Sequence, residues 1–275
     1  MKFVERLARA WSSRQSLLCV GLDPDPAKLP QHLAAADYPI FEFGRAIVDA
    51  TADLVCAFKP QIAYYAAARA EDQLEMTIAH IRRNHPEIPV ILDAKRGDIG
   101  STAEMYAREA FVRYQADALT VSPYLGADSL APYLAYADKG VIVLCRTSNP
   151  GARDVQDIES EGRKLYQIVA EKAARDWNAN GNVLLVVGAT YPEELAQIRG
   201  IVGDMPILVP GVGAQGGDVA AVIAKGATAD GTGLVISTSR AVLYADSGPD
   251  YARAARTAAL KLHDEINLCR NTKTA

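Results

Sequence analysis

The stretch PVILDAKRGDIGSTAEMYAREAFVRY (residues 89–114) changes character twice along its length. It opens on a short apolar run, passes through a charged segment, and continues rich in Ala, Glu and Arg. Short runs of Val, Ile and Leu bounded by Pro, Gly or Asp are typical of strands buried on both faces. Ser101 followed three residues later by Glu104 matches a capping box and predicts a helix start. The stretch therefore predicts one strand followed by one helix.

The same alternation recurs along the whole chain. Seven further apolar runs are each followed by a segment of helical character: SLLCVGLD (16–23), LVCAFKP (54–60), DALTVSP (117–123), GVIVLCR (140–146), NVLLVVG (182–188), PILVPG (206–211) and GLVISTS (233–239). Eight units in 275 residues average about 34 residues each, and a further helix is expected at the N-terminus. Strict alternation of strand and helix implies a parallel sheet.

Eight units in a chain of this length favour closure into a (β/α)8 TIM barrel. The alternative is an open doubly wound sheet. Against it, the first run is followed by DPDPAKLP and not by a GxGxxG turn. No linker composition divides the chain, so residues 1–275 are predicted to form a single barrel domain with an extra N-terminal helix.

Composition excludes several functional classes. The formal charge of −4 and the absence of a basic arm or block argue against nucleic-acid binding. No apolar run approaches the roughly 20 residues that span a bilayer, and the first residues lack a signal-peptide core. We therefore expect a cytoplasmic protein. The four cysteines show no metal-ligand spacing and are predicted to be inert buried thiols.

Charged residues stand where several predicted strands end. Active sites of (β/α)8 barrels lie at the C-terminal ends of the strands. Because residues i and i+2 of a strand share a face, Asp93 and Lys95 should point the same way. Pointing inward, they would meet Lys59 and Asp23 from neighbouring strands; pointing outward, they would bury an ion pair that gains little. A purely structural salt-bridge cluster is the alternative, because such networks occur without catalysis.

This arrangement of charges favours decarboxylation over aldol chemistry. Flanking carboxylates favour the ammonium form of a lysine, which is a poor Schiff-base nucleophile but a good general acid. Two carboxylates ~4 Å apart repel by about 4 kcal/mol at an effective dielectric near 20. The repulsion between Asp93 and a substrate carboxylate held against it would be relieved when that group leaves as neutral CO2. Lys95 would then protonate the carbanion.

Two loops have features of ligand-binding segments. The glycines of VPGVGAQGGD (209–218) allow backbone amides to approach an anion, the following helix start adds its dipole, and Arg240 follows the next strand. A phosphorylated substrate is expected there; the alternative is a glycine-rich turn without a ligand. The segment CRTSNPGARD (145–154) has the character of an active-site lid or of an ordinary surface loop.

These motifs resemble those of a known family. DAKRGDIGST resembles the Asp-x-Lys-x-x-Asp motif of the orotidine 5′-phosphate decarboxylase family, and PGVGAQGG resembles its phosphate-gripper loop. VGLDPDP, FKPQ, SPYLGADSL and LCRTSNPGA are similar to the longer bacterial branch of that family. The resemblance implies conversion of orotidine 5′-monophosphate (OMP) to UMP in pyrimidine biosynthesis, without a cofactor or metal.

The resemblance also implies a catalytic role for each charged residue. Lys95 would protonate C6 of the pyrimidine, and Asp93 and Asp98 would flank the departing carboxylate. Lys59 would complete an alternating Lys-Asp-Lys-Asp network and touch the ribose, and Asp23 would bind a ribose hydroxyl.

The remaining implied contacts concern the base, the phosphate and a second subunit. Ser148 would contact the pyrimidine, Pro210 would border it, and Gln215 and Arg240 would hold the phosphate. Asp98, with Ile99 and Thr102 beside it, would reach into the active site of the partner in a homodimer.

This chain departs from the family's shorter members in two respects. Segments 61–72 and 146–160 are longer, and Ser239 precedes Arg240 where glycine is expected. Two other functions stay open. One is an Mg-dependent sugar-phosphate decarboxylase or aldolase of the same suprafamily, although Lys59 stands where such a metal site needs an acid. The other is a non-catalytic sugar-phosphate-binding barrel, which would gain by losing the repulsive Asp93.

Overall fold

Eight parallel strands form the centre of the molecule. The computed structural model describes residues 1–212 and 217–274. The strands pair in the order β2-β1-β10-β9-β8-β5-β4-β3. Their bounds are β1 (Leu18–Leu22), β2 (Ala57–Pro60), β3 (Ile91–Arg96), β4 (Ala118–Val121), β5 (Gly140–Arg146), β8 (Val183–Val187), β9 (Ile207–Pro210) and β10 (Leu234–Thr238). Each of the eight predicted runs overlaps one of these strands, and only β3 extends beyond its run, to Arg96. This confirms the (β/α)8 barrel and excludes the open sheet.

The barrel closes between β2 and β3, which stand at the two ends of the strand order. Isolated parallel bridges join Phe58 to Val90 and Gln61 to Asp93 across this seam. The Phe58 amide also donates a hydrogen bond of 3.1 Å to the carbonyl of Pro89. The seam is thus closed by single bridges, whereas β1 and β2 are joined by a continuous ladder.

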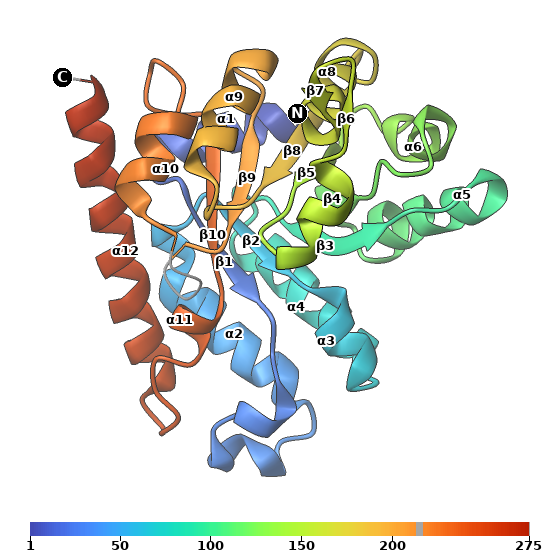
Figure 1. Cartoon of the computed structure of the whole chain (residues 1–275). Coiled ribbons are helices and arrows are strands. Elements are labelled where there is room, and N and C mark those ends of the chain that lie inside the picture. The colour runs from blue at the N-terminus through green and yellow to red at the C-terminus, as the bar shows by residue number, and fades with distance from the viewer. Residues whose placement is uncertain (213–216, 275) are drawn as a thin grey trace.

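Helices surround the strands, and the C-terminal helix α12 runs along one side (Figure 1). The α-helices are α1 (Phe3–Arg14), α2 (Pro39–Thr51), α3 (Ile62–Ala67), α4 (Glu71–Asn84), α5 (Gly100–Arg108), α6 (Ala127–Leu134), α7 (Arg153–Gln156), α8 (Leu165–Arg175), α9 (Pro192–Val202), α10 (Val219–Gly226), α11 (Arg240–Leu243) and α12 (Tyr251–Thr274). A π-helical turn (Glu109–Arg113) extends α5.

The predicted N-terminal helix is α1, and it packs on the N-terminal ends of the strands. Arg6 forms an ion pair with Asp117, just before β4, and the Phe3 amide donates to the Asp138 carbonyl, just before β5. Phe3, Leu7 and Trp11 are buried. Helix α1 therefore covers the end of the barrel opposite to the one where the strands terminate.

Two details of the predicted helices are wrong. Helix α5 begins at Gly100 with Ile99 as its N-cap and no side-chain cap, so Ser101 does not form the expected capping box. The composition of residues 157–177 predicts a helix from residue 157, but α8 begins only at Leu165, because β6 (Glu159–Ser160) and β7 (Arg163–Lys164) form a small antiparallel hairpin first. Glu161 and Gly162 at its tip have positive φ values, which a helix does not accommodate.

Three of the four cysteines are buried as predicted, whereas Cys269 on α12 is only partly buried. Cys19, Cys56 and Cys145 are free and buried, and burial raises the pKa of the Cys19 thiol to about 12. No helix within the described part of the chain is long and apolar enough to cross a membrane.

The contact between α1 and β5 generates a stability prediction. A Cβ at Gly140 would lie 2.4 Å from Cδ1 of Phe3 and 2.8 Å from Cβ of Ala118. Gly140→Ala should therefore lower the free energy of unfolding by about 1–3 kcal/mol through overpacking, as measured by urea denaturation. Gly200→Ala on α9 is the matched control, because its Cβ meets nothing within 4 Å. The control should be neutral or stabilise by up to ~1 kcal/mol. Equal effects of the two changes would contradict the overpacking argument.

Candidate active site

A pocket of about 400 Å³ opens where the strands end. Residues from the ends of β1, β2, β3, β9 and β10 line it, together with Tyr64 from α3. They are Asp23, Lys59, Tyr64, Asp93, Pro210, Gly211, Val212, Ser237, Thr238, Ser239 and Arg240. The pocket therefore lies at the end of the barrel where the sequence predicted a functional site.

Asp93 is the centre of a buried ion network. Its Oδ2 accepts a hydrogen bond of 2.9 Å from Nζ of Lys59, and its Oδ1 accepts one of 2.7 Å from Nζ of Lys95. Only 11% of the Asp93 side chain and 6% of the Lys59 side chain are exposed, whereas 47% of the Lys95 side chain is exposed. The two lysines thus differ: Lys59 is enclosed by protein and lines the pocket, whereas Lys95 is about half exposed and is not among the residues that line it.

The network keeps Asp93 ionised despite its burial. Burial raises the pKa of the Asp93 carboxyl, but the charges and hydrogen bonds of Lys59 and Lys95 more than offset this and hold it well below its ordinary value. Burial likewise lowers the pKa of Lys59, yet the charges of Asp93 and Asp23 raise it above its ordinary value. A buried carboxylate and a buried ammonium are therefore both charged at neutral pH.

Lys95 reaches Asp93 through an irregular backbone. Its φ of 48° lies in the left-handed region, which is uncommon for a residue with a side chain. The pairing of β3 with β4 shifts register between Leu92 and Arg96 at the same place. The predicted contact of Asp93 with Lys95 is confirmed, but simple strand alternation does not account for it.

Thr120 on β4 supports this irregularity, and sequence reasoning missed it. Its Oγ1 accepts the amides of Ala94 at 3.0 Å and Lys95 at 2.9 Å, and the hydroxyl donates to Asp93 Oδ1 at 2.9 Å. One buried hydroxyl thus uses its donor and both acceptor positions. The available signal was a single hydroxyl residue within the otherwise apolar strand β4.

Asp23 follows β1 and faces the same pocket. Its Oδ1 is buried and accepts no hydrogen bond from protein within the described residues, so it can accept one from a ligand hydroxyl. The Tyr244 hydroxyl fixes the adjoining backbone: it donates to the Asp23 carbonyl at 3.0 Å and accepts from the Asp25 amide at 2.7 Å. Tyr244 is a second residue that sequence reasoning missed.

Pro210 and Arg240 line the pocket on the side of β9 and β10. Gln215 lies outside the residues that the structure describes. Helix α10 starts where expected, with Asp218 as its N-cap, and the Asp218 carboxylate accepts hydrogen bonds from the amides of Ala220 and Ala221. Those two amides are engaged by the chain itself and are not available to a phosphate.

Ser148 stands outside the pocket lining, above the end of β8. A Cβ at Gly188 would lie 2.9 Å from the Ser148 Cβ, so the glycine permits this close approach. The loop around Ser148 is internally braced: the Thr147 amide donates to Gln156 Oε1 at 2.9 Å, and Gln156 Nε2 donates back to the Thr147 hydroxyl at 2.8 Å.

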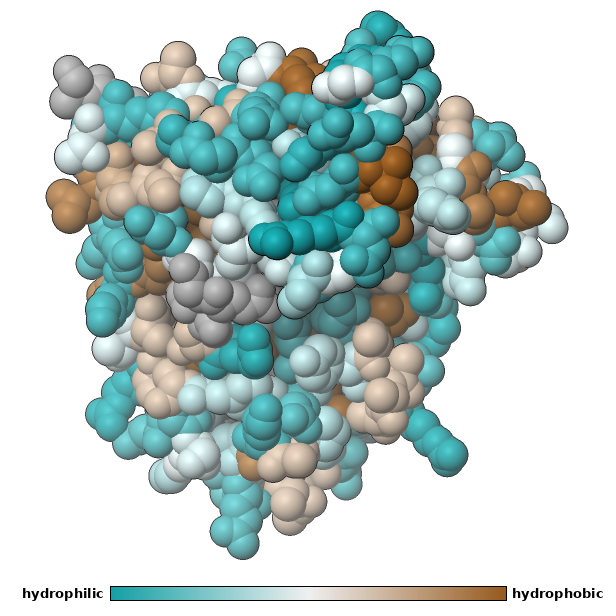
Figure 2. All heavy atoms as spheres, in the orientation of Figure 1, coloured by the Kyte–Doolittle hydropathy of each residue, from teal (hydrophilic) through white to brown (hydrophobic). Residues whose placement is uncertain are grey.

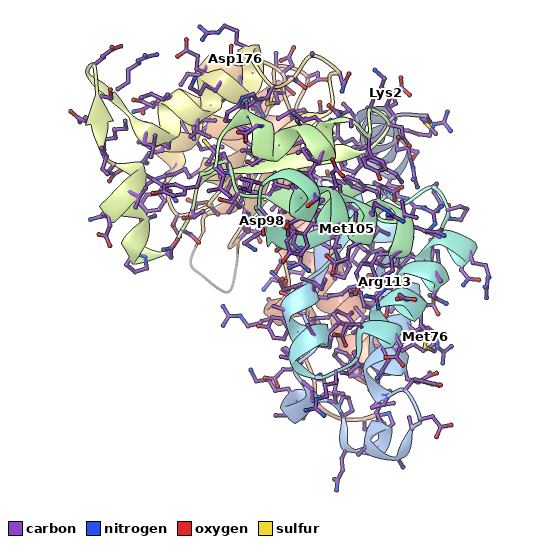
Figure 3. The ribbon with its side chains drawn as sticks, turned by 90° about the vertical axis from the view of Figure 1, so that its right-hand side faces the viewer. Lys2, Met76, Asp98, Met105, Arg113 and Asp176 are labelled. Atoms are coloured by element: carbon purple, nitrogen blue, oxygen red, sulfur yellow. The ribbon has the colours of Figure 1, made fainter. Side chains whose placement is uncertain are left out.

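Asp98, Ile99 and Thr102 do not line this pocket. Asp98 Oδ1 accepts the Ile99 amide at 2.8 Å, 58% of Ile99 is exposed, and Thr102 is exposed on α5. Figure 3 shows Asp98 on the same side of the molecule as Met105 of α5. Within the described residues, no hydrogen bond or ion pair joins Asp98 to Asp93 or to Lys95.

Arg96 turns away from the pocket. It makes a bidentate ion pair with Glu109 at 2.8–3.1 Å and stacks over Tyr106 with its guanidinium 4.5 Å from the ring centroid. Arg96 thus anchors β3 to the helical segment that follows it and has a structural role.

Comparison with known proteins decides the family. The model of the "Orotidine 5′-phosphate decarboxylase / HUMPS family" matches residues 16–256. The chain belongs to the orotidine 5′-phosphate decarboxylase / HUMPS family.

Members of this family resemble the chain over its full length. The chain is 66% identical to the orotidine 5′-phosphate decarboxylase of Ralstonia pickettii and 64% identical to that of Dechloromonas aromatica, over 98% of this chain and 100% of each relative. The solved structure of Leishmania donovani OMP decarboxylase superposes with a TM-score of 0.85 at 41% identity, over 98% of this chain and 99% of that one.

The role of Thr120 generates the second prediction. Thr120→Val keeps the side-chain volume but leaves the amides of Ala94 and Lys95 without their acceptor. We expect a loss of about 1–3 kcal/mol in the free energy of unfolding by urea denaturation. Thr120→Ser keeps the hydroxyl and should retain most of that stability. If Val and Ser variants are equally stable, the hydroxyl does not support the backbone at Lys95.

Proposed function

We propose that this chain decarboxylates OMP to UMP and CO2 in de novo pyrimidine biosynthesis, without a cofactor. The observation that carries the proposal is the ionised, buried Asp93 held between Lys59 and Lys95 at a pocket mouth. A carboxylate in that position repels an anionic substrate group, and the exposed ammonium of Lys95 adjoins the place where that group would lie.

The reaction follows from these charges. The substrate carboxylate, held against Asp93, is destabilised by about 4 kcal/mol at ~4 Å separation and an effective dielectric near 20. Cleavage of the bond from C6 to the carboxylate carbon releases neutral CO2 and leaves the electron pair on C6. The Lys95 ammonium stabilises that pair and transfers its proton to C6, and solvent then reprotonates the lysine. Lys95 acts as the general acid, and Asp93 supplies the repulsion.

The remaining predicted residues are assigned to parts of the nucleotide. Lys59 and Asp23 contact the ribose, and the unpartnered Oδ1 of Asp23 supports a hydroxyl contact. Ser148 and Pro210 border the pyrimidine. Gln215 and Arg240 hold the phosphate, and Arg240 is supported by its place in the pocket lining.

A metal-dependent reaction of the same suprafamily is the second candidate, and the site argues against it. Such a site needs a further acid beside Asp93, and Lys59 occupies the end of β2 instead. Among the described residues, the group whose ligand atoms lie close enough to hold a metal ion does not include Asp93.

We further propose a homodimer in which Asp98, Ile99 and Thr102 complete the partner's active site. Their separation from the pocket of their own chain supports this arrangement. Exposed apolar side chains lie on and beside α5, namely Ile99, Met105, Val112, Tyr124 and Leu125. Hydrophobic side chains also gather at the edge formed by α5 and α6 in Figure 2. An apolar surface of this kind favours burial between subunits.

The proposal also covers the domain organisation and the location of the protein. The single eight-stranded sheet supports one barrel domain over residues 1–275. A biosynthetic role and the lack of a membrane-spanning helix among the described residues are consistent with a cytoplasmic location.

Lys95→Ala should abolish OMP decarboxylation while preserving the fold. Loss of the proton donor and of the charge that stabilises the carbanion should lower kcat by at least about 10⁴-fold. The assay follows the change in absorbance from OMP to UMP, with circular dichroism as the measure of folding. Lys261→Ala, on the exposed face of α12, should keep wild-type activity. A wild-type protein that leaves OMP unchanged would refute the proposed function.

The shared site predicts complementation between inactive variants. Asp98→Ala and Lys95→Ala chains, mixed in equal amounts and allowed to exchange subunits, should recover about one quarter of wild-type activity. Half of the dimers are then mixed, and one of the two sites in each mixed dimer is intact. Without recovery, despite subunit exchange verified by native mass spectrometry, Asp98 would belong to the site of its own chain.

Removal of metal should leave the activity unchanged. Because the proposed chemistry relies on Lys95 and Asp93, EDTA-treated protein should retain full kcat in metal-free buffer. Activity that falls with EDTA and returns with Mg²⁺ would favour the metal-dependent alternative.

A further inference from the structure

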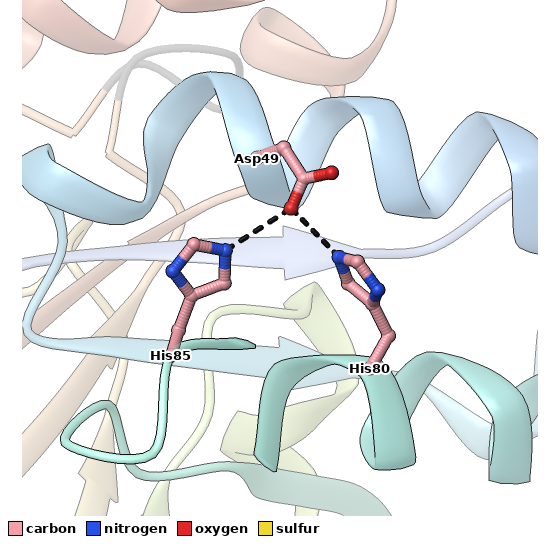
Figure 4. A group of neighbouring side chains, drawn as sticks. All are labelled: Asp49, His80 and His85. Carbon is pink, nitrogen blue, oxygen red and sulfur yellow. Dashed lines mark hydrogen bonds and ion pairs between the residues drawn. The ribbon is translucent and has the colours of Figure 1, made fainter. Parts of the chain in front are cut away.

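Three side chains with metal-ligating atoms converge between α2 and α4, away from the pocket lining. Nε2 of His80 lies 2.7 Å from Oδ1 of Asp49, and Nε2 of His85 lies 3.0 Å from the same oxygen. One ligand atom from each residue lies within 4.8 Å of the other two. Figure 4 shows both imidazole rings directed at this one oxygen, with the second carboxylate oxygen pointing away.

The spacing of these atoms is close to that of a tetrahedral metal site. A Zn²⁺ ion about 2.0–2.1 Å from each ligand would place neighbouring ligand atoms about 3.3 Å apart. The two observed distances to Asp49 Oδ1 are shorter by only a few tenths of an ångström. The Asp49 side chain is 44% exposed, whereas those of His80 and His85 are 15% and 21% exposed, so rotation of the Asp49 carboxylate is the adjustment that would admit the ion.

The electrostatic setting favours a cation. Asp49 lies in the last turn of α2, and His85 is the C-cap of α4, so the negative ends of two helix dipoles meet at this point. Burial raises the pKa of the Asp49 carboxyl, but hydrogen bonds from His80 and His85 more than offset this and lower it. The carboxylate is thus charged at neutral pH and available as a ligand.

Asn84 provides an outer contact for one of the rings. Its Nδ2 lies 2.9 Å from Nδ1 of His80 and 3.0 Å from the His80 carbonyl oxygen. A histidine that binds metal through Nε2 carries its proton on Nδ1, and rotation of the Asn84 amide brings Oδ1 into place to accept it. Metal binding therefore exchanges the Nε2 proton for the ion and moves the tautomer to Nδ1–H.

We propose that Asp49, His80 and His85 form a binding site for one divalent transition-metal ion that imidazole favours, such as Zn²⁺, separate from the catalytic pocket. The site offers two nitrogens and one oxygen, with the exposed side of Asp49 leaving room for a fourth ligand from solvent. A bound ion would link α2 to α4 and so would stabilise the folded chain.

Isothermal titration of tag-free, chelator-treated protein with ZnSO₄ at pH 7.5 tests the proposal. The wild type should bind one equivalent at this site, and its melting temperature should rise with Zn²⁺. His80→Ala and His85→Ala should each weaken binding at least about tenfold, because each loses a ligand. Asp49→Asn keeps the side-chain shape and should also weaken it.

The matched control is His263→Ala on α12. His263 also adjoins a carboxylate, that of Asp264 at 3.1 Å, and an asparagine four residues on, but no second histidine. This variant should bind Zn²⁺ like the wild type. With Cu²⁺ as a probe, electron paramagnetic resonance should show coupling to two imidazole nitrogens, reduced to one in either ligand variant. No binding by the wild type, or equal binding by the wild type and both histidine variants, would overturn the proposal.

Discussion

The buried pair of Lys59 and Asp93 is the interaction on which the site depends. Burying either charge alone would cost several kcal/mol, and only a close partner makes it tolerable. Here the carboxylate is shared: Lys59 takes one oxygen, while Lys95 and Thr120 take the other. Three strands, β2, β3 and β4, must therefore meet in register before the charges are compensated. The closed barrel sets that register, and the Lys59–Asp93 ion pair can form only when the register is correct.

Much of this arrangement follows from sequence patterns with a direct physical basis. Strands buried on both faces must be continuously apolar, so all eight could be located from runs of Val, Ile and Leu. Lys59 and Asp93, at the ends of two of those runs, line the pocket as expected, whereas Arg96 at the end of β3 pairs outward with Glu109. Pro192 likewise indicates the start of α9, because the amide that proline lacks has no hydrogen-bond partner at the first position of a helix.

Other features depend on tertiary contacts that leave little trace in local sequence. The left-handed backbone at Lys95 breaks strand alternation and is held by a hydroxyl 25 residues away. The hairpin before α8 occupies residues whose composition favours a helix, but positive φ values at Glu161 and Gly162 reverse the chain. The pair His80 and His85 has a spacing that matches no metal motif, and only the packing of α2 on α4 brings Asp49 to them.

The Lys59–Asp93 ion pair also helps to hold the barrel closed between β2 and β3. Isolated bridges close the barrel there, and the ion pair crosses the same gap. A ladder interrupted in this way is a natural place for local opening. Separation of β2 from β3 would also leave the buried charges of Lys59 and Asp93 without each other as partners. The free-energy cost of local opening at this junction is therefore high. Lys59 and Asp93 thus stabilise the junction of β2 with β3, and slow amide exchange along both strands is the expected result.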